Sequence, residues 1–210
     1  MKKLILILAV QITVFISVGY GDDYGGNEEL RRIHETRTQA LMDKLEVTPA
    51  SSDKIQRPCK PVFTKESISG VTLHKSGTKD GYISGERLYF RHNGKTDAYI
   101  HIYYRNSAQE AQLELFEDLA GCTLPTEGLL LSYVKVPKGP GDLCIAGNVK
   151  PTHNKTLEEC TPVVYFTRAN IFVSVISDVP EISAMEIARK VDTILAGSME
   201  QQGKHSPEPR

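Results

Sequence analysis

The sequence predicts an α+β fold: a mainly antiparallel sheet covered by two helices, with a further helix near the N-terminus. Two observations support this prediction. Short β-rich segments come in pairs joined by tight turns, at Asn93-Gly94 and at Ala169-Asn170. An amphipathic segment with helical spacing follows each pair. Strands that cluster along the chain, with helices left to cover the sheet, are typical of this class.

The first 21 residues have the layout of a secretory signal peptide. Two lysines precede an apolar run at residues 4–18, and small residues follow it. The run is shorter than the ~20 apolar residues of a membrane span, and two polar residues interrupt it. We expect cleavage after Gly19 or Gly21, no stable membrane span afterwards, and a mature protein that is secreted or periplasmic.

A helix is expected next, at residues 28–45. Asn27 is a candidate N-cap, acidic residues occupy the first turn, and apolar residues recur at helical spacing. Those apolar positions are Leu30, Ile33, Leu41 and Leu45. Proline and serine residues then predict a linker up to Pro58. Residues 22–58 are therefore expected to be a helix and linker outside the main domain, which we place at residues 59–197.

The first half of that domain predicts strands followed by a helix. Residues 62–74 are β-biased, and stronger strands are expected at residues 81–91 and 97–105. Ser107-Ala108-Gln109-Glu110 is a capping box, which predicts that a helix begins there. Gly121 is placed to end this helix.

The second half predicts a similar succession. Strands are expected at residues 129–136, 143–146, 162–168 and 171–177. A helix should follow at 180–195 and end at Gly197. Residues 198–210 have no apolar periodicity, so a disordered tail is expected.

The two halves resemble each other in order and in short stretches of sequence. Leu88-Tyr89-Phe90 and Ala120-Gly121 in the first half correspond to Val164-Tyr165-Phe166 and Ala196-Gly197 in the second. Both alternatives, two β-β-α half-repeats and a chance similarity, stay open.

The charge balance is ordinary. Removing the two lysines of the signal leaves 23 basic residues against 26 acidic ones, a formal charge of −3. Nucleic-acid binding favours a basic protein, so we expect no nucleic-acid partner.

Four cysteines in an exported chain favour two disulfides. Cys144 and Cys160 bracket a polar loop, and closing ~15 residues contributes roughly 3 kcal/mol. We therefore predict Cys144–Cys160 and Cys59–Cys122 bridges, with free buried thiols as the alternative. The chain has no C-x-x-C pair or nearby histidine cluster, so no metal site is predicted. Gly94-Lys95-Thr96 lacks the upstream glycine of a phosphate-binding loop, and no cofactor is predicted.

One strand carries the candidate binding residues. Tyr99, His101 and Tyr103 alternate along it, so they share one side and could line a ligand surface. The same pattern also fits an ordinary half-buried sheet surface. A second hypothesis uses Cys144 as a nucleophile with a histidine, either His101 or His153.

Part of the chain, roughly residues 80–197, resembles exported bacterial proteins of unknown function. The resemblance rests on Gly141-Asp142-Leu143-Cys144, on the turn at Arg168-Ala169-Asn170 between two strands, and on a final helix with Ala188-Arg189-x-x-Asp192. Ala169 stands where glycine is common in that turn. The resemblance implies an exported protein with a compact α+β fold and implies no activity.

The expected function is thus that of an exported binding or interaction module without catalysis, with a protein or small-molecule ligand. The alternative is a small secreted hydrolase or thiol enzyme that uses Cys144.

Overall fold

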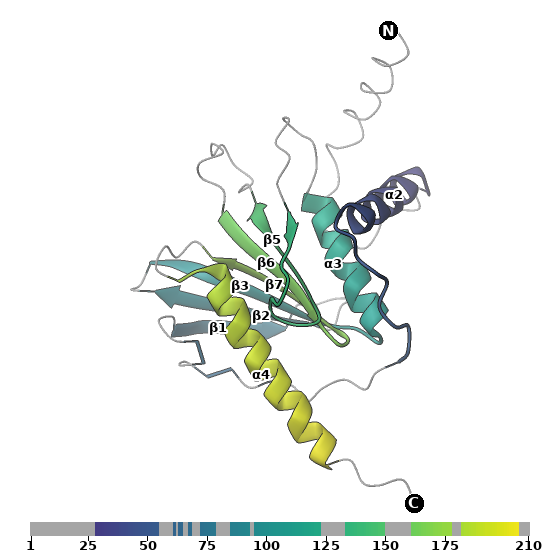
Figure 1. Ribbon diagram of the computed structural model, residues 1–210. Helices are drawn as coiled ribbons and strands as arrows, with labels where there is room; N and C mark the ends of the chain where they lie inside the picture. The colour runs from purple at the N-terminus through teal and green to yellow at the C-terminus, as the bar shows by residue number, and fades with distance from the viewer. Residues whose placement is uncertain are drawn as a thin grey trace, which may run out of the picture. The chain divides into compact units, whose positions relative to one another are not determined.

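The computed structural model describes residues 28–54, 61, 63–64, 67–68, 72–78, 85–92, 95–122, 133–149, 161–177 and 182–205 (Figure 1). The predicted signal peptide and its cleavage positions lie outside these residues. So do Cys59, Cys160 and His153, together with the side chain of Cys122.

The described elements confirm the α+β class. In chain order they are α2 (Glu28–Lys44), β1 (Thr72–Thr78), β2 (Gly85–His92), β3 (Lys95–Tyr104), α3 (Ala108–Cys122), β4 (Val134–Lys135), β5 (Leu143–Val149), β6 (Thr161–Arg168), β7 (Ile171–Ser177) and α4 (Ala184–His205). The strands form one sheet in the order β1-β2-β3-β7-β6-β5-β4. Every neighbouring pair is antiparallel.

The described chain divides into two compact units. One contains α2, up to Thr48, and the second half of α3 from Phe116 onward. The other contains the sheet, the first half of α3 and α4. The expected N-terminal helix is present, and its buried residues include Thr38 and Met42. The predicted Leu45, directly after the helix end, is buried as well.

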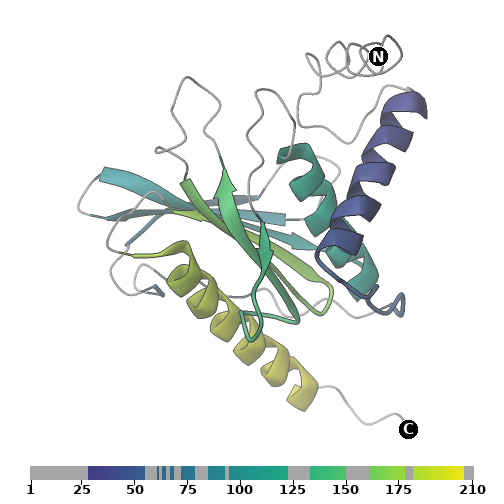
Figure 2. The ribbon, with the colours of Figure 1, turned by 45° about the horizontal axis from the view of Figure 1, so that its top comes forward.

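The main core lies between the sheet and α4, which crosses one face of the sheet (Figure 2). Alternate residues of the central strands point to this face, as the two-residue period of a strand requires. Burying each large apolar side chain contributes roughly 1.5–3 kcal/mol. The buried residues include Ile100, Ile102, Val164, Phe166, Val173 and Val175 from the sheet and Ile187, Val191 and Leu195 from α4.

The two halves of the sheet meet where β3 pairs with β7. Each half ends in a helix that begins with the same cap. The Glu110 N–H donates to Ser107 Oγ at 3.1 Å, and the Glu186 N–H donates to Ser183 Oγ at 3.2 Å. These contacts confirm the predicted first capping box and reveal a second one. The first half of α3 lies on the side of the sheet opposite α4 (Figures 1 and 2).

The end of α4 differs from the prediction. The helix continues through Gly197 to His205, so residues 198–205 are not a disordered tail. Gly197 does not have the positive φ of a helix-ending glycine. Met199 packs against the core, which gives the extra turns an apolar anchor.

The predicted linker is also more ordered than expected. The Ala50 N–H donates to Gln112 Oε1 at 2.9 Å, and Ser51 O accepts from the Gln109 N–H at 2.9 Å. Lys54 pairs with Ser107 in an isolated β-bridge. The unit that holds the sheet therefore starts at Pro49, ahead of the expected boundary at Cys59.

Candidate functional site

Four half-buried aromatic side chains lie together on the face of the sheet opposite α4. Tyr89 pairs with Tyr99 across β2 and β3, and their rings meet edge to face with centroids 5.5 Å apart. Two residues further along β3, His101 contacts Tyr103 edge to face at 6.3 Å. We call Tyr89, Tyr99, His101 and Tyr103 the aromatic strip. The three residues predicted from β3 are thus brought together, and each is half-buried.

Tyr89 is the member of the strip that the sequence prediction missed. A two-residue turn at Asn93-Gly94 would pair Tyr89 with Ala98 and place it on the other face of the sheet. A register shift between Arg91 and His92 instead sets Tyr89 opposite Tyr99, and the sequence gives no signal for this shift.

Buried rings on the same face of the sheet adjoin one end of the strip, because Phe172 is the residue of β7 opposite Tyr103. Tyr103 stacks on Phe172 with centroids 5.3 Å apart, and Phe172 stacks on Tyr165 at 6.2 Å. Phe172 is 0% exposed and Tyr165 is 1% exposed. Aromatic stacking adds ~0.5–1.5 kcal/mol per pair to the burial of the rings. One end of the strip is therefore held in a fixed position by buried rings beside it.

A cation lies against the same end of the strip. The Arg105 guanidinium carbon is 5.5 Å from the centroid of the Tyr103 ring. Glu114 on α3 holds this guanidinium, with Nη2 and Oε2 2.8 Å apart. The exposed fractions of the two side chains are 14% and 21%, so the pair is mostly shielded from water. Arg105 thus fixes the ring by a cation–π contact while its charge is partly balanced.

The next residue on β3 belongs to the other face. Tyr104 donates its hydroxyl to Glu86 Oε1 at 3.3 Å. Burial, and then the negative charge of Glu86, raise the pKa of the Tyr104 hydroxyl above its ordinary value. Tyr104 is therefore a natural control for the strip, being a tyrosine on the same strand with the opposite orientation.

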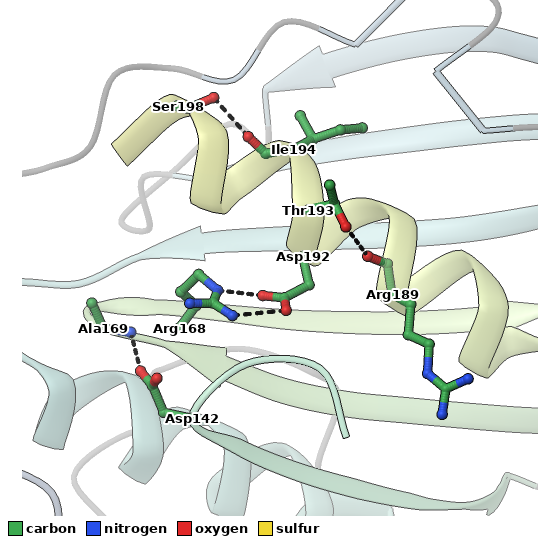
Figure 3. A network of polar contacts seen from close by, with 8 residues as sticks. All are labelled: Asp142, Arg168, Ala169, Arg189, Asp192, Thr193, Ile194 and Ser198. Carbon is green, nitrogen blue, oxygen red and sulfur yellow. Dashed lines mark hydrogen bonds and ion pairs between the residues drawn. The ribbon is translucent and has the colours of Figure 1, made fainter. Parts of the chain in front are cut away.

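A second polar group gathers at the turn between β6 and β7 (Figure 3). Asp142 Oδ2 accepts a 2.6 Å hydrogen bond from the Ala169 N–H. Arg168 donates twice to Asp192 on α4, from Nε to Oδ1 and from Nη2 to Oδ2 at 2.8 Å. The hydrogen bond to Asp192 raises the pKa of Arg168. We call Asp142, Arg168, Ala169 and Asp192 the turn cluster.

The turn cluster unites the residues that carried the sequence resemblance. It ties the β4–β5 loop, the β6–β7 turn and α4 to one point, although these segments are far apart in the chain. Arg189, the other charged residue of the pattern, is exposed and points away from the cluster (Figure 3). The carboxylates and the guanidinium of the cluster bond to one another or to the backbone. The cluster therefore serves to hold the loop, the turn and α4 together.

Ala169 adopts a left-handed backbone conformation in this turn, with φ of 48°. That conformation costs roughly 1–2 kcal/mol for a residue with a Cβ and little for glycine. We expect Ala169→Gly to stabilise the protein by about 1 kcal/mol in urea unfolding. Ala196→Gly, within α4, is the matched control and should destabilise by about the same amount. A loss of stability in Ala169→Gly would contradict this account.

Cys144 is a free thiol in the core, 3% exposed. The predicted Cys144–Cys160 disulfide is therefore wrong, and the register of the sheet explains why. Cys144 stands opposite Phe166, whereas the other end of β5, Val149, stands opposite Thr161. Five residues of strand span about 17 Å, so Cys144 lies at the opposite end of the β5–β6 pair from the residue at which β6 begins. The Cys59–Cys122 bridge stays a prediction.

The environment of Cys144 does not suit a nucleophile. Burial raises the pKa of the thiol to about 12, so it is protonated at neutral pH. Cys144 belongs to the same core cluster as Ile100 and Ile102, on the α4 side of the sheet, whereas His101 belongs to the strip on the other side. The proposed pairing of Cys144 with His101 is therefore wrong, and His153 lies outside the described residues.

Native Cys144 is expected to resist alkylation. Iodoacetamide at mildly alkaline pH should leave the Cys144 peptide unmodified in folded protein, because only the thiolate reacts. After denaturation the same peptide should be labelled fully, as mass spectrometry of a tryptic digest would show. Rapid labelling of the native thiol, or a peptide linked to Cys160, would contradict the structure.

Within the described residues, no group of three or more histidine, cysteine, aspartate or glutamate side chains could hold a metal ion. No helix among those described is both long enough and apolar enough to cross a membrane. Comparisons with protein-family models, with curated proteins and with solved structures give no match for this chain.

Proposed function

We propose that the protein is an exported, non-catalytic module that binds carbohydrate chains on its aromatic strip. The observation that carries the proposal is the grouping of Tyr89, Tyr99, His101 and Tyr103 on one face of two adjacent strands. The layout of residues 1–21 supports export to the periplasm or beyond. Intact-mass analysis of the exported protein, with Tyr20 or Asp22 as the expected first residue, tests this part.

Tyrosine and histidine suit a sugar chain. Each ring presents an apolar surface together with a polar group that can form hydrogen bonds. A pyranose likewise has an apolar face of C–H groups and a rim of hydroxyls. In a chain of sugars lying across β2 and β3, each sugar could place its apolar face on one ring of the strip. Its hydroxyls could then form hydrogen bonds with the polar group of that ring.

The strip is also rigid enough to bind without much loss of entropy. Tyr103 is stacked on Phe172 and lies beside Arg105, while Tyr89 and Tyr99 contact each other. Each mobile side chain that a ligand must immobilise costs ~0.5–1.5 kcal/mol. Rings already held by neighbours avoid part of that cost.

The opposing hypothesis, a thiol enzyme using Cys144, has less support. The thiol is buried, its pKa is raised, and the sheet separates it from His101. Catalysis by Cys144 would require a large rearrangement of the core between the sheet and α4.

Affinity electrophoresis tests the proposal. Native gels containing a neutral β-glucan, a mannan or a polygalacturonate should retard the wild-type protein in at least one case. Tyr99→Ala should weaken that retardation at least tenfold, as expected when one stacked ring is lost. Tyr104→Ala is the matched control, which removes a tyrosine from the other face and should bind like the wild type. Failure of all three polymers to retard the protein, or equal effects of the two substitutions, would overturn the proposal.

A further inference from the structure

The aromatic strip consists of two similar ring pairs that follow one another along β3. The rings of Tyr89 and Tyr99 meet at an interplanar angle of 82°, and those of His101 and Tyr103 meet at 86°. Each pair therefore sets the face of one ring beside the edge of another, on the same face of the sheet. Two similar pairs in succession suit a ligand that itself consists of repeating units.

The strip is longer than a single sugar. Alternate residues of a strand are about 7 Å apart, so Tyr99 and Tyr103 are separated by about 14 Å along β3. A pyranose is only slightly larger than a tyrosine ring. A ligand that touches both tyrosines therefore needs at least three sugars linked in an extended chain.

Burial on β7 indicates the direction of the ligand. Phe172 stands opposite Tyr103 and Ser174 stands opposite His101, so both belong to the face that carries the strip. Phe172 is 0% exposed and Ser174 is 4% exposed, whereas the residues of the strip are half-buried. A chain laid perpendicular to the strands at either position would reach a side chain that is already covered. A chain parallel to β3 stays on the strip and meets both ring pairs.

We infer that the ligand is a linear chain of at least three sugars, bound lengthwise along β3. This inference rests on the proposed function and extends it to the length and direction of the ligand. One part of the chain lies on the Tyr89–Tyr99 pair, and another lies on the His101–Tyr103 pair. Monosaccharides and disaccharides reach only part of the strip, so they bind more weakly than longer chains.

Oligosaccharides of defined length test the inference on the wild-type protein. Chains of one to six sugars are prepared from each polymer, β-glucan, mannan or polygalacturonate, that retards the protein in native gels. In isothermal titration calorimetry, the dissociation constant should fall at least tenfold from the disaccharide to the tetrasaccharide. It should fall less than threefold from the tetrasaccharide to the hexasaccharide. Equal affinity for the disaccharide and the hexasaccharide would overturn the inference.

Tryptophan reporters test the direction of the chain. Tyr89→Trp, Tyr99→Trp and Tyr103→Trp each keep an aromatic ring in the strip, and the natural chain contains no tryptophan. The tetrasaccharide should shift the emission of all three variants. Tyr104→Trp, on the other face of β3, is the matched control and should not respond. Responses at Tyr89 and Tyr99 without one at Tyr103 would indicate a chain perpendicular to the strands and would overturn the inference.

The outcomes separate the two proposals. Circular dichroism melts check the fold of each variant, and the length series on the wild-type protein decides the matter if Tyr103→Trp does not fold. If a polymer binds through Tyr99 but chain length has no effect, the inference falls and the proposed function stands. If none of the three polymers binds, the proposed function falls together with the inference.

Discussion

Gly141→Ala is expected to destabilise the protein by about 3 kcal/mol or more, enough to unfold a marginal domain. Gly141 has φ of 72°, where a residue with a Cβ is strained. An added Cβ would come 2.1 Å from Thr167 O and 2.8 Å from Phe166 Cδ2. Neither neighbour can move easily, because Thr167 O accepts from the Asp142 N–H at 2.6 Å and Phe166 is in the core.

Urea unfolding followed by circular dichroism measures this effect. Gly197→Ala is the matched control, since nothing lies within 4 Å of a Cβ at that position in α4. Alanine favours a helix over glycine, so the control should be neutral or stabilised by up to ~1 kcal/mol. A Gly141→Ala variant as stable as the wild type would show that the β4–β5 loop is not held as described.

Removing the ion pair between Arg168 and Asp192 is the second large effect expected. The two side chains are 27% and 15% exposed, so their attraction is screened less than that of a surface pair. Replacing either residue alone leaves a partly buried charge unpaired, and we expect each single substitution to alanine to cost about 2 kcal/mol. The double variant should cost less than the two singles added together.

A double-mutant cycle measures this coupling directly. The coupling energy should be about 1–2 kcal/mol and should fall only modestly in high salt. Arg32 and Glu28 on α2 provide a comparison, because this exposed pair is 3.4 Å apart with exposed fractions of 74% and 55%. Its coupling should be a few tenths of a kcal/mol. Equal coupling energies in the two cycles would show that the Arg168–Asp192 pair does not stabilise the attachment of α4 to the β6–β7 turn.

Local signals predicted local structure well. The Ser-x-x-Glu pattern at Ser107 marks the start of α3 because the cap is made by residues within one turn. The turn between β6 and β7 was predicted for the same reason. In contrast, Gly197 predicts a helix end that the structure does not have, because α4 continues to His205. Here Met199 packs against the core, a contact that the sequence does not display.

Long-range features could not be predicted in the same way. Arg168 and Asp192 were both noted in the sequence pattern, yet only the packing of α4 on the sheet brings them together. The disulfide prediction failed because β5 extends to Val149, which places Cys144 at the far end of the hairpin. Tyr99, His101 and Tyr103 could be grouped because strand alternation is itself a local rule.

Tryptophan fluorescence tests the central proposal, binding at the aromatic strip, most directly. The chain contains no tryptophan, so Tyr99→Trp introduces a single reporter while keeping an aromatic ring in the strip. Titration with a polymer that retards the protein should shift the emission and saturate, and Tyr104→Trp, on the other face of β3, should show no change. If a polymer retards the protein in native gels but does not change the emission of Tyr99→Trp, binding at the strip is contradicted. Equal changes in emission at the two positions would also contradict it.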